Sequence, residues 1–485
     1  MSSLPALELR KRSIDARRGR VRFHLILGVK GPDEPIGGAP LREVSGDPVI
    51  IIGGGPAGLF CAYELARTGI RSVIVDRGKQ VQARRRDLKG LTQHGTVDPD
   101  SNYCYGEGGA GTYSDGKLYT RSHKRGDVRD VIEILALHGA PTDILLDARP
   151  HIGSNKLPKV ITALRERLEG VGSTIRFGAR VTDLVVRDGR AIGVRLADGD
   201  ELLGRAVVAA TGHSARDVHA LLMRAGVQLE AKPFAMGVRI EHPQPLIDRI
   251  QYGRAAGHPK LPAAPYRLAF TPSDGRGAFS FCMCPGGWIV PASTEADGLV
   301  VNGMSLSRRD SPYANSGLVV AIELADLDRL GLSRPLGGVE LQRRLEQAAM
   351  QAGGGELRAP ATRATDFVRR KASSTVPATS YQPGLTATDI GAVLDAIGIP
   401  LAARLREAFG AFDQQMRGYL TDEAVLVGVE SRTSSPVRVP RDPVSLMSPD
   451  LDELYPCAEG AGYAGGIVSA ALDGIRVARA ISSRT

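Results

Sequence analysis

The chain has 485 residues, of which 42% are hydrophobic and 24% charged, a composition typical of a globular protein with two or three lobes. No apolar run approaches the length of a membrane-spanning helix, and the first residues, MSSLPALELRKR, lack the pattern of a secretory signal. Five cysteines in a chain of this length do not make a disulfide framework, so we expect a cytoplasmic protein.

The formal net charge is +9, and most of it lies in residues 1–30, where eight Lys or Arg accompany two acidic residues. The stretch ALELRKRSIDARRGRVRFHLILGV predicts a strand, a short helix and a second strand. We therefore expect a small basic α+β module over residues 1–47, ending in a Gly- and Pro-rich linker. Such a module could contact RNA, a membrane surface or an acidic partner. We favour a solvated face and expect no nucleic-acid partner.

Residues 49–78, VIIIGGGPAGLFCAYELARTGIRSVIVDRG, predict a buried strand, a glycine turn, a helix and a second strand. Gly53 permits the turn, Gly55 lets a pyrophosphate approach the backbone, and Gly58 lets the helix pack closely on the strand. Pro56 suits the first helical turn. Asp76 ends the second strand at close to the spacing of about 20 residues expected for an acid that bonds a ribose hydroxyl. This segment therefore predicts a dinucleotide site.

The G-x-G-x-x-G pattern recurs as GEGGAG at residues 106–111 and as GAGYAG at residues 460–465. The first copy has no clear strand before it, and the second has no following strand and acid. Neither therefore predicts a second nucleotide site by itself. In particular, the chain has no second complete fingerprint for a nicotinamide cofactor.

The remaining pattern predicts a nucleotide-binding domain that is interrupted by an insertion. Residues 79–130 read as a long functional loop. Helices are expected over 158–168, 339–351 and 401–420, strands over 174–210 and 424–431, and an antiparallel meander over 266–305. A strand, glycine turn and helix return at 454–481. We therefore expect a first nucleotide-domain part over 48–229, an inserted domain over 230–440, and a returning part over 441–485.

Several motifs together resemble those of a known family: the first fingerprint, GEGGAGTYSDGKL, VVAATG, FCMCPGGWIVPAS, ESRTSSPVR and YPCAEGAGYAGGIVSAALDGIRVARAI. As a set, spread over nearly the whole chain, they resemble the FAD-dependent dehydrogenases or oxidoreductases related to the glutathione-reductase type of FAD fold. The resemblance implies an α/β fold, with a Rossmann-like FAD-binding domain and an inserted mixed α+β substrate domain.

The resemblance also implies FAD as cofactor and assigns its contacts residue by residue. Asp76 would bond the adenosine ribose, with Arg77 and Val181 at the adenine, and Glu459 would bond the ribityl chain in place of the usual Asp. Lys117 would contact the ribityl chain, the pyrophosphate or the flavin edge, or would lie as a surface ammonium. The full set of predicted cofactor residues is Gly53, Gly55, Pro56, Ala57, Gly58, Asp76, Arg77, Gly108, Gly109, Gly111, Thr112, Lys117, Val181, Ala210, Gly212, Glu459, Gly460, Gly465, Gly466 and Ile467.

Other residues are candidates for chemistry. Glu241 and His242 lie beside prolines and could act as general acid or base. Cys282 and Cys284 would share one face of a strand, so either a redox pair or two buried thiols is conceivable, although a disulfide at this spacing is strained. Arg432 could anchor an anionic substrate. No metal-ligand pattern accompanies these residues.

The expected activity is that of an FAD-dependent oxidoreductase that transfers hydride between flavin N5 and a small organic substrate. A nicotinamide donor would have to reach the flavin without a Rossmann domain of its own. The alternatives are an FAD-dependent monooxygenase and a flavin-bearing protein that binds or modifies RNA.

Overall fold

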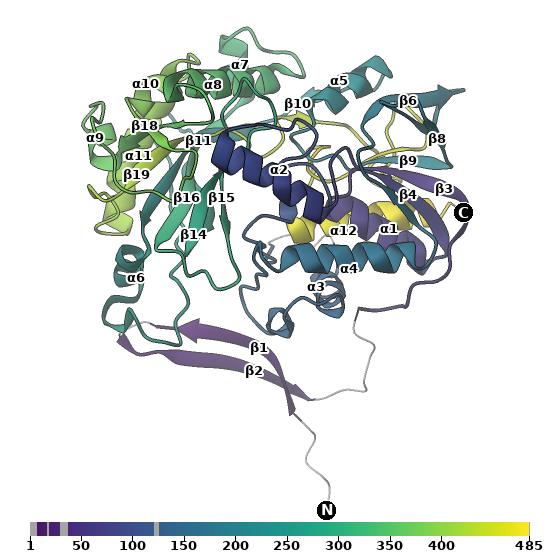
Figure 1. The fold of residues 1–485 in the computed structure, drawn as a ribbon, viewed down its shortest axis with the longest axis horizontal. Helices are drawn as coiled ribbons and strands as arrows, with labels where there is room; N and C mark the ends of the chain where they lie inside the picture. Colours follow the sequence, from purple (N-terminus) through teal and green to yellow (C-terminus); the bar gives the residue numbers. More distant parts are fainter. Residues whose placement is uncertain (1–6, 17–18, 30–36, 121–125, 485) are drawn as a thin grey trace, which may run out of the picture.

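The computed structural model describes residues 1–485 except 1–6, 17–18, 30–36, 121–125 and 485. It has two lobes and an N-terminal β-hairpin that runs along one side of both (Figure 1). The first lobe holds the predicted nucleotide fingerprint, and the second is formed mainly by the inserted segment. This mixed α/β organisation confirms the predicted fold class. None of the described helices has the length and apolar character needed to cross a bilayer.

The hairpin consists of β1 (Leu7–Asp15) and β2 (Arg22–Val29), which pair antiparallel with a bulge between Leu9 and Lys11. The strand continues up to Asp15, with Ile14 opposite Phe23, and Gly19 has a 3-10 helical conformation, so the short helix expected between the two strands stays a prediction. Residues 17 and 18, between the two strands, and residues 30–36, the first part of the predicted linker, lie outside the described residues. β1 is fixed to the first lobe by Arg12, which donates to Asp147.

The first lobe is built on a parallel sheet of five strands in the order β21-β9-β3-β4-β5. Their bounds are β3 (Ser45–Ile52), β4 (Ile70–Val75), β5 (Thr174–Arg176), β9 (Ala206–Ala209) and β21 (Leu454–Pro456). The half of β3 from Val49 to Ile52 is buried, as expected for a strand covered on both faces. The predicted strand, glycine turn, helix and strand are therefore confirmed, with α1 (Pro56–Arg67) as the helix.

Helix α12 (Ile467–Ser482) packs along α1, although more than 400 residues separate them in sequence (Figure 1). The contact is close because a Cβ on Gly474 would lie 2.1 Å from the carbonyl oxygen of Ala57. The last segment thus completes the first lobe. The lobe also contains α3 (Val128–Leu137), α4 (Leu157–Glu169), α5 (Arg216–Arg224), and a small sheet of β6 (Val181–Arg187), β7 (Arg190–Leu196) and β8 (Glu201–Leu203).

The reading of residues 79–130 as one long loop is wrong in part, because α2 (Val81–His94) lies within it. Its sequence, VQARRRDLKGLTQH, buries only Arg84, Leu88 and Leu91, so the apolar periodicity is weak. The fully buried Arg84 donates to the carbonyl oxygens of Asn102, Tyr103, Glu107 and Gly109. A buried guanidinium thus joins this helix to the loop that follows it.

The second lobe contains a seven-stranded sheet in the order β12-β13-β16-β11-β19-β17-β18. The strands are β11 (Phe234–Pro243), β12 (Ala269–Phe270), β13 (Ala278–Cys284), β16 (Tyr313–Ile322), β17 (Ala359–Arg363), β18 (Leu385–Ala387) and β19 (Val425–Glu430). Helices α6 (Gln244–Tyr252), α7 (Leu324–Arg329), α8 (Gly337–Gly353), α9 (Ala364–Val368), α10 (Ile390–Asp395) and α11 (Leu401–Gln415) surround it. The two long predicted helices correspond to α8 and α11.

The predicted antiparallel meander over 266–305 is two pairs in different sheets. β12 pairs with β13 in the large sheet, whereas β14 (Gly287–Pro291) pairs with β15 (Val301–Ser305) in a sheet of their own. The second neighbour of β13 in the large sheet is β16. The strand positions were predicted correctly, but their pairing depends on residues further along the chain.

The two passages of the chain between the lobes lie side by side. β10 (Glu230–Ala231) pairs antiparallel with β20 (Val437–Arg438), close to the predicted domain boundaries at 230 and 440. The division of the chain into these domains remains a proposal, with which this pairing agrees.

Candidate functional site: a cavity between the two lobes

A cavity of about 830 Å³ lies against the carboxyl ends of β3, β4 and β9. In a parallel sheet this edge is where ligands usually bind. The first lobe contributes the β3–α1 turn, the loop of residues 104–120 and the segment 458–470. The second lobe contributes Phe281, Cys282, Asn302 and residues 432–434. The cavity is large enough for an organic cofactor.

The β3–α1 turn forms one wall through Gly53, Gly55, Pro56 and Ala57. Gly53 has φ of +108°, and a Cβ there would lie 2.4 Å from the carbonyl oxygen of Ala210. Gly58 does not line the cavity. A Cβ on it would lie 2.0 Å from the carbonyl oxygen of Gly53, so its role is the close packing of helix and turn.

Asp76 lines the cavity and is almost fully buried. Its Oδ2 accepts from the backbone N–H of Gly54 at 2.8 Å, and its Oδ1 accepts from Gly78 at 2.8 Å and Gly106 at 3.0 Å. The carboxylate thus ties three glycine-containing turns together. Because a carboxylate oxygen can accept two hydrogen bonds, Oδ2 retains capacity for the ribose hydroxyl predicted from the sequence.

At the same end of the cavity lie Arg77, Val181, Ala210 and Gly212. Arg77 pairs with Asp100 at 2.7 Å and with Asp217 at 2.9 Å, and its guanidinium lies 4.6 Å from the centre of the Tyr105 ring. These contacts fix Arg77 as one side of the cavity, where the resemblance puts the adenine.

The loop of residues 104–120 brings Gly109, Gly111 and Lys117 to the cavity. Gly109 lies against the first turn, since a Cβ on it would lie 3.0 Å from the Cα of Gly55. Gly108 and Thr112 are not among the lining residues. Thr112 donates from Oγ1 to the carbonyl oxygen of Glu107, so these two residues shape the loop from behind.

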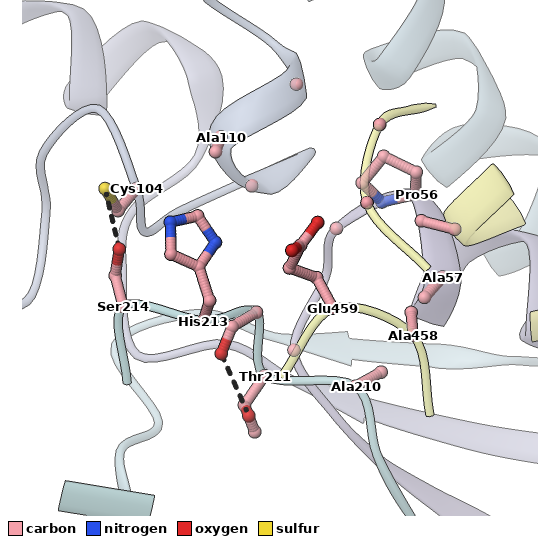
Figure 2. Close-up of a pocket in the computed structure, with 18 of the residues that line it drawn as sticks. Pro56, Ala57, Cys104, Ala110, Ala210, Thr211, His213, Ser214, Ala458 and Glu459 are labelled. Atoms are coloured by element: carbon pink, nitrogen blue, oxygen red, sulfur yellow. Dashed lines mark hydrogen bonds between the residues drawn. The ribbon is translucent and has the colours of Figure 1, made fainter. Parts of the chain in front are cut away.

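The C-terminal segment contributes Glu459, Gly465, Gly466 and Ile467 to the lining, whereas Gly460 packs behind it against Gly212. Figure 2 shows the Glu459 carboxylate projecting into the cavity from the turn that follows β21. Burial raises the pKa of Glu459, and Lys232 opposes this shift. Gly465 leaves room for the carboxylate, because a Cβ there would lie 1.9 Å from Oε2 of Glu459.

Two helix N-termini open into this cavity. Helix α1 begins after Gly55 and α12 begins after Gly466, and neither N-cap forms a side-chain capping hydrogen bond. The first backbone N–H groups of a helix and the positive end of its dipole favour an anion. One N-terminus suits a pyrophosphate and the other an electron-rich ring edge. Together with the glycine cradle, these donors fit FAD.

Glu241 and His242 do not line the cavity. Both lie in the buried part of β11, where Glu241 accepts from Thr379 Oγ1 and from the backbone N–H of Ser380. Nε2 of His242 lies 2.8 Å from the carbonyl oxygen of Tyr419, and burial lowers the pKa of His242 to about 4. The structure thus gives these residues hydrogen-bonding roles inside the second lobe and does not bring them to the candidate site.

His213, which was not among the predicted residues, lines the cavity directly after Gly212. Figure 2 shows its ring on the strand-end segment that carries Thr211 and Ser214. Burial, and then the charge of Arg432, lowers the pKa of His213 to about 4, so the ring is neutral near pH 7. Its position at the carboxyl end of β9 was the available signal. Arg432 also lines the cavity, but its guanidinium is held by Glu346 and Thr294.

Comparison with known proteins agrees with this assignment. Residues 233–433 match the family described as FAD-dependent protein, C-terminal domain-like, and residues 47–97 match an FAD binding domain. An uncharacterized protein of Clostridium beijerinckii is 39% identical over 98% of this chain and 92% of its own length.

More distant similarities are partial or weak. Protein FixC of Salmonella typhi is 28% identical and matches 42% of this chain and 45% of its own length. The crystal structure of CtdE in complex with FAD covers 91% of this chain and 89% of that chain, at 11% identity and a TM-score of 0.33, a value too low to support any inference. The family assignment rests on the match over nearly the whole of the Clostridium relative and on the two FAD family matches. The chain belongs to a family of FAD-dependent oxidoreductases, and FAD is its cofactor.

Proposed function

We propose that the protein is a dehydrogenase or reductase that exchanges hydride with a small organic substrate in the cavity between the lobes. The observation that carries this proposal is that both lobes line the same cavity. Most of the predicted cofactor residues, together with Cys282, Asn302 and Thr433 of the second lobe, line one continuous cavity of about 830 Å³. Bound FAD supplies hydride acceptance and donation at N5.

The protein's own part in this reaction is to bind, orient and exclude water. The backbone N–H groups at the starts of α1 and α12 hold negative charge, and Asp76 and Glu459 accept hydrogen bonds from hydroxyl groups. The neutral ring of His213 can hydrogen-bond a substrate without adding charge to the site. The second lobe supplies the part of the cavity wall against which we place the substrate.

The test is the absorbance spectrum of the purified protein, followed by anaerobic titration with NADH and then NADPH. A flavin spectrum that bleaches with one nicotinamide establishes a reductase half-reaction and identifies the donor. A flavin that stays oxidised with both, but bleaches with an organic substrate, establishes a substrate-fed dehydrogenase. Absence of flavin absorbance after FAD is added back would overturn the proposal.

Oxygen distinguishes the monooxygenase alternative. A dehydrogenase of the proposed kind returns its electrons to an organic acceptor, and mixing the reduced protein with air should insert no oxygen atom into that molecule. Product formation under ¹⁸O₂, followed by mass spectrometry, gives the answer. A labelled product would replace the proposed function with oxygen insertion.

A further inference from the structure

The cavity wall contains a thiol pair that the proposed hydride transfer does not use. Cys282 lies in the lining and is exposed to it, whereas Cys284 is buried. Nζ of Lys117 lies 3.8 Å from Sγ of Cys282 and 3.7 Å from Sγ of Cys284. One ammonium group is thus in contact with both sulfur atoms, which places the two sulfurs on the same side of the strand.

A bulge in β13 brings the two cysteines together. The pairing with β16 passes from Phe281 opposite Gly317 to Cys284 opposite Asn315, so an additional residue is accommodated between them. Cys282 has φ of +44°, a left-handed conformation that is unusual for a residue with a side chain. In a regular strand the two Cα atoms would be about 6.6 Å apart, near the upper limit for a disulfide, and the bulge departs from that regular geometry.

Charged groups from four segments surround the pair. On the loop before α3, Asp115 lies 3.4 Å from Lys117 Nζ, and it also pairs at 2.5 Å with Arg309, on the loop between β15 and β16. On β11, Nη2 of Arg239 donates to the carbonyl oxygen of Cys282 at 2.7 Å and lies 3.6 Å from Sγ of Cys284. On β19, Glu430 pairs with Arg239.

The balance of these charges favours a thiolate on the exposed cysteine. A hydrogen bond from Cys284, and then the positive charges of Lys117 and Arg239, hold the pKa of Cys282 well below that of an ordinary thiol, against the opposing effect of burial. The pKa of Cys284 is raised by the same hydrogen bond and by burial. An accessible thiolate beside a protonated partner thiol is the arrangement that supports thiol–disulfide exchange.

We propose that Cys282 and Cys284 form a redox-active pair that exchanges with small disulfides entering the cavity, with Cys282 as the nucleophile and Cys284 as the resolving thiol. The Cys282 thiolate attacks one sulfur of the small disulfide, forming a mixed disulfide and releasing one small thiolate. Cys284 then attacks Sγ of Cys282. This second step forms the internal disulfide and releases the second small thiol, which takes the proton of Cys284. Two electrons pass from the protein pair to the small disulfide.

The first test measures thiolate character directly on the flavin-loaded protein. Iodoacetamide labelling at pH values from 5 to 10, followed by peptide mass spectrometry, compares Cys282 with Cys104. Cys104 is a matched control because it lines the same cavity, while its sulfur accepts a hydrogen bond from Ser214 rather than from a lysine. We expect Cys282 to be labelled at least tenfold faster than Cys104 at pH 6. Equal rates and equal pH profiles for the two cysteines would refute the proposal.

Substitution of Lys117 tests whether its positive charge makes Cys282 reactive. Lys117→Met should slow the labelling of Cys282 at pH 6 by about tenfold or more and move the midpoint of its pH profile upward, because an adjacent cation stabilises a thiolate. Lys117→Arg keeps the charge and should keep most of the reactivity. Labelling that is the same in all three proteins would show that Lys117 does not activate the thiol. Flavin content, read from the absorbance spectrum, is recorded separately.

The second test distinguishes a pair from a single reactive thiol. After treatment with glutathione disulfide, the wild-type protein should lose two hydrogens and carry no glutathione, and dithiothreitol should reverse the change. Cys284→Ser should retain one glutathione on Cys282, and Cys282→Ser should remain unmodified at Cys284. A stable glutathione adduct on the wild-type protein, or no reaction in any variant, would contradict the paired mechanism. None of these outcomes depends on whether the flavin accepts hydride.

Discussion

At the scale of single residues, the site is organised by carboxylates that contact glycines. Asp76 accepts from the N–H groups of three glycine turns, and Glu459 lies where only a glycine at position 465 leaves room for it. In both places, a side chain in place of the glycine would displace a carboxylate that the cofactor is expected to contact. The glycines are therefore needed both for their backbone freedom and for the space that they leave.

Gly465→Ala tests this arrangement. The added methyl would lie 1.9 Å from Oε2 of Glu459, so the carboxylate or the loop must move. We expect FAD to bind about tenfold more weakly or worse, a loss of about 1.4 kcal/mol, as measured by flavin fluorescence titration of the apoprotein.

The control for that variant is Gly410→Ala in the exposed face of α11, where no atom lies within 4 Å of the added carbon. It should leave FAD affinity unchanged and raise the free energy of unfolding by about 0.5–1 kcal/mol, since alanine is the better helix former. Unchanged FAD affinity in Gly465→Ala would show that Glu459 is not held as described.

At the scale of elements, the two lobes are joined by a buried ion cluster. Glu346 on α8 accepts from Arg216 on α5 at 2.8 Å and from Arg432, after β19, at 2.9 Å. Although burial opposes the charge, the two guanidinium groups hold the pKa of Glu346 at about 2, compared with an ordinary value of 4.5. The folded state therefore binds the proton of this group less readily than the unfolded state does.

The sign of the pH dependence follows. A lowered folded-state pKa contributes stability that is complete above pH 4.5 and is lost as the pH falls toward 2, in total about 3 kcal/mol. Glu346→Gln should remove this component, so its unfolding free energy should depend less on pH in that range than that of the wild type. At pH 7 the variant should be less stable by about 3–5 kcal/mol, because two buried guanidinium groups lose their partner. Urea denaturation at several pH values measures both effects.

Glu340→Gln is the matched control on the same helix. Glu340 pairs with Arg344 at 3.0 Å on the surface of α8, so its loss should cost less than about 1 kcal/mol. If the two variants were equally stable at pH 7, the buried cluster would not join the lobes in the way the contacts indicate.

Elements that depend on nearby sequence were predicted well. The strand, turn and helix around Gly53–Arg67 follow from local apolar runs and glycine chemistry, and so do α4, α8 and α11. Elements that depend on distant residues were not predicted well. Helix α2 is held by Arg84 bonds to a loop about 20 residues away, and the partner of β13 is β16 rather than the nearer β14. Periodicity contains no signal for either contact.

The candidate site shows the same division. The glycines, Asp76 and Glu459 could be predicted because a fingerprint and a resemblance mark them, and Asp76, Glu459 and most of these glycines line the cavity. Glu241 and His242 were chosen from residue type alone, and the structure places both among internal hydrogen bonds of the second lobe. His213 was not predicted because a single histidine after a strand belongs to no sequence motif that would link it to other site residues.

At the scale of the whole molecule, the β1–β2 hairpin stands apart from the cavity. One of its sides carries the pairs Leu7–Val29, Leu9–Leu27 and Ile14–Phe23, and most of these side chains are exposed, with Leu25 between them at 54%. Basic residues including Arg10 and Arg22 lie in the same two strands. The hairpin is thus an apolar and basic surface outside the flavin site.

Removal of residues 1–36 should leave flavin content and the melting temperature nearly unchanged, because the described hairpin residues line no part of the main cavity and few of them are buried. It should also reduce self-association at high salt, where exposed apolar surface dominates, as measured by light scattering. Loss of flavin on truncation would show that the hairpin supports the first lobe.

The same truncation tests the RNA alternative. If the basic strands bind RNA, the intact protein should bind tRNA with a steep salt dependence that the truncated protein lacks. We expect weak, salt-sensitive binding at most, in keeping with a solvated hairpin. Tight binding at low salt, with a steep salt dependence that disappears on truncation, would instead support an RNA-directed function.

The side-by-side packing of α1 and α12 has a consequence for biosynthesis. The ribosome releases β3 and α1 early, but β21 and α12, which complete the sheet and one end of the cofactor cavity, follow after the entire second lobe. The nascent first lobe must therefore wait, with one face of α1 uncovered, until the second lobe has been made. Chaperone dependence should consequently be concentrated in this interval, and stalled chains that end before residue 454 should emerge without flavin.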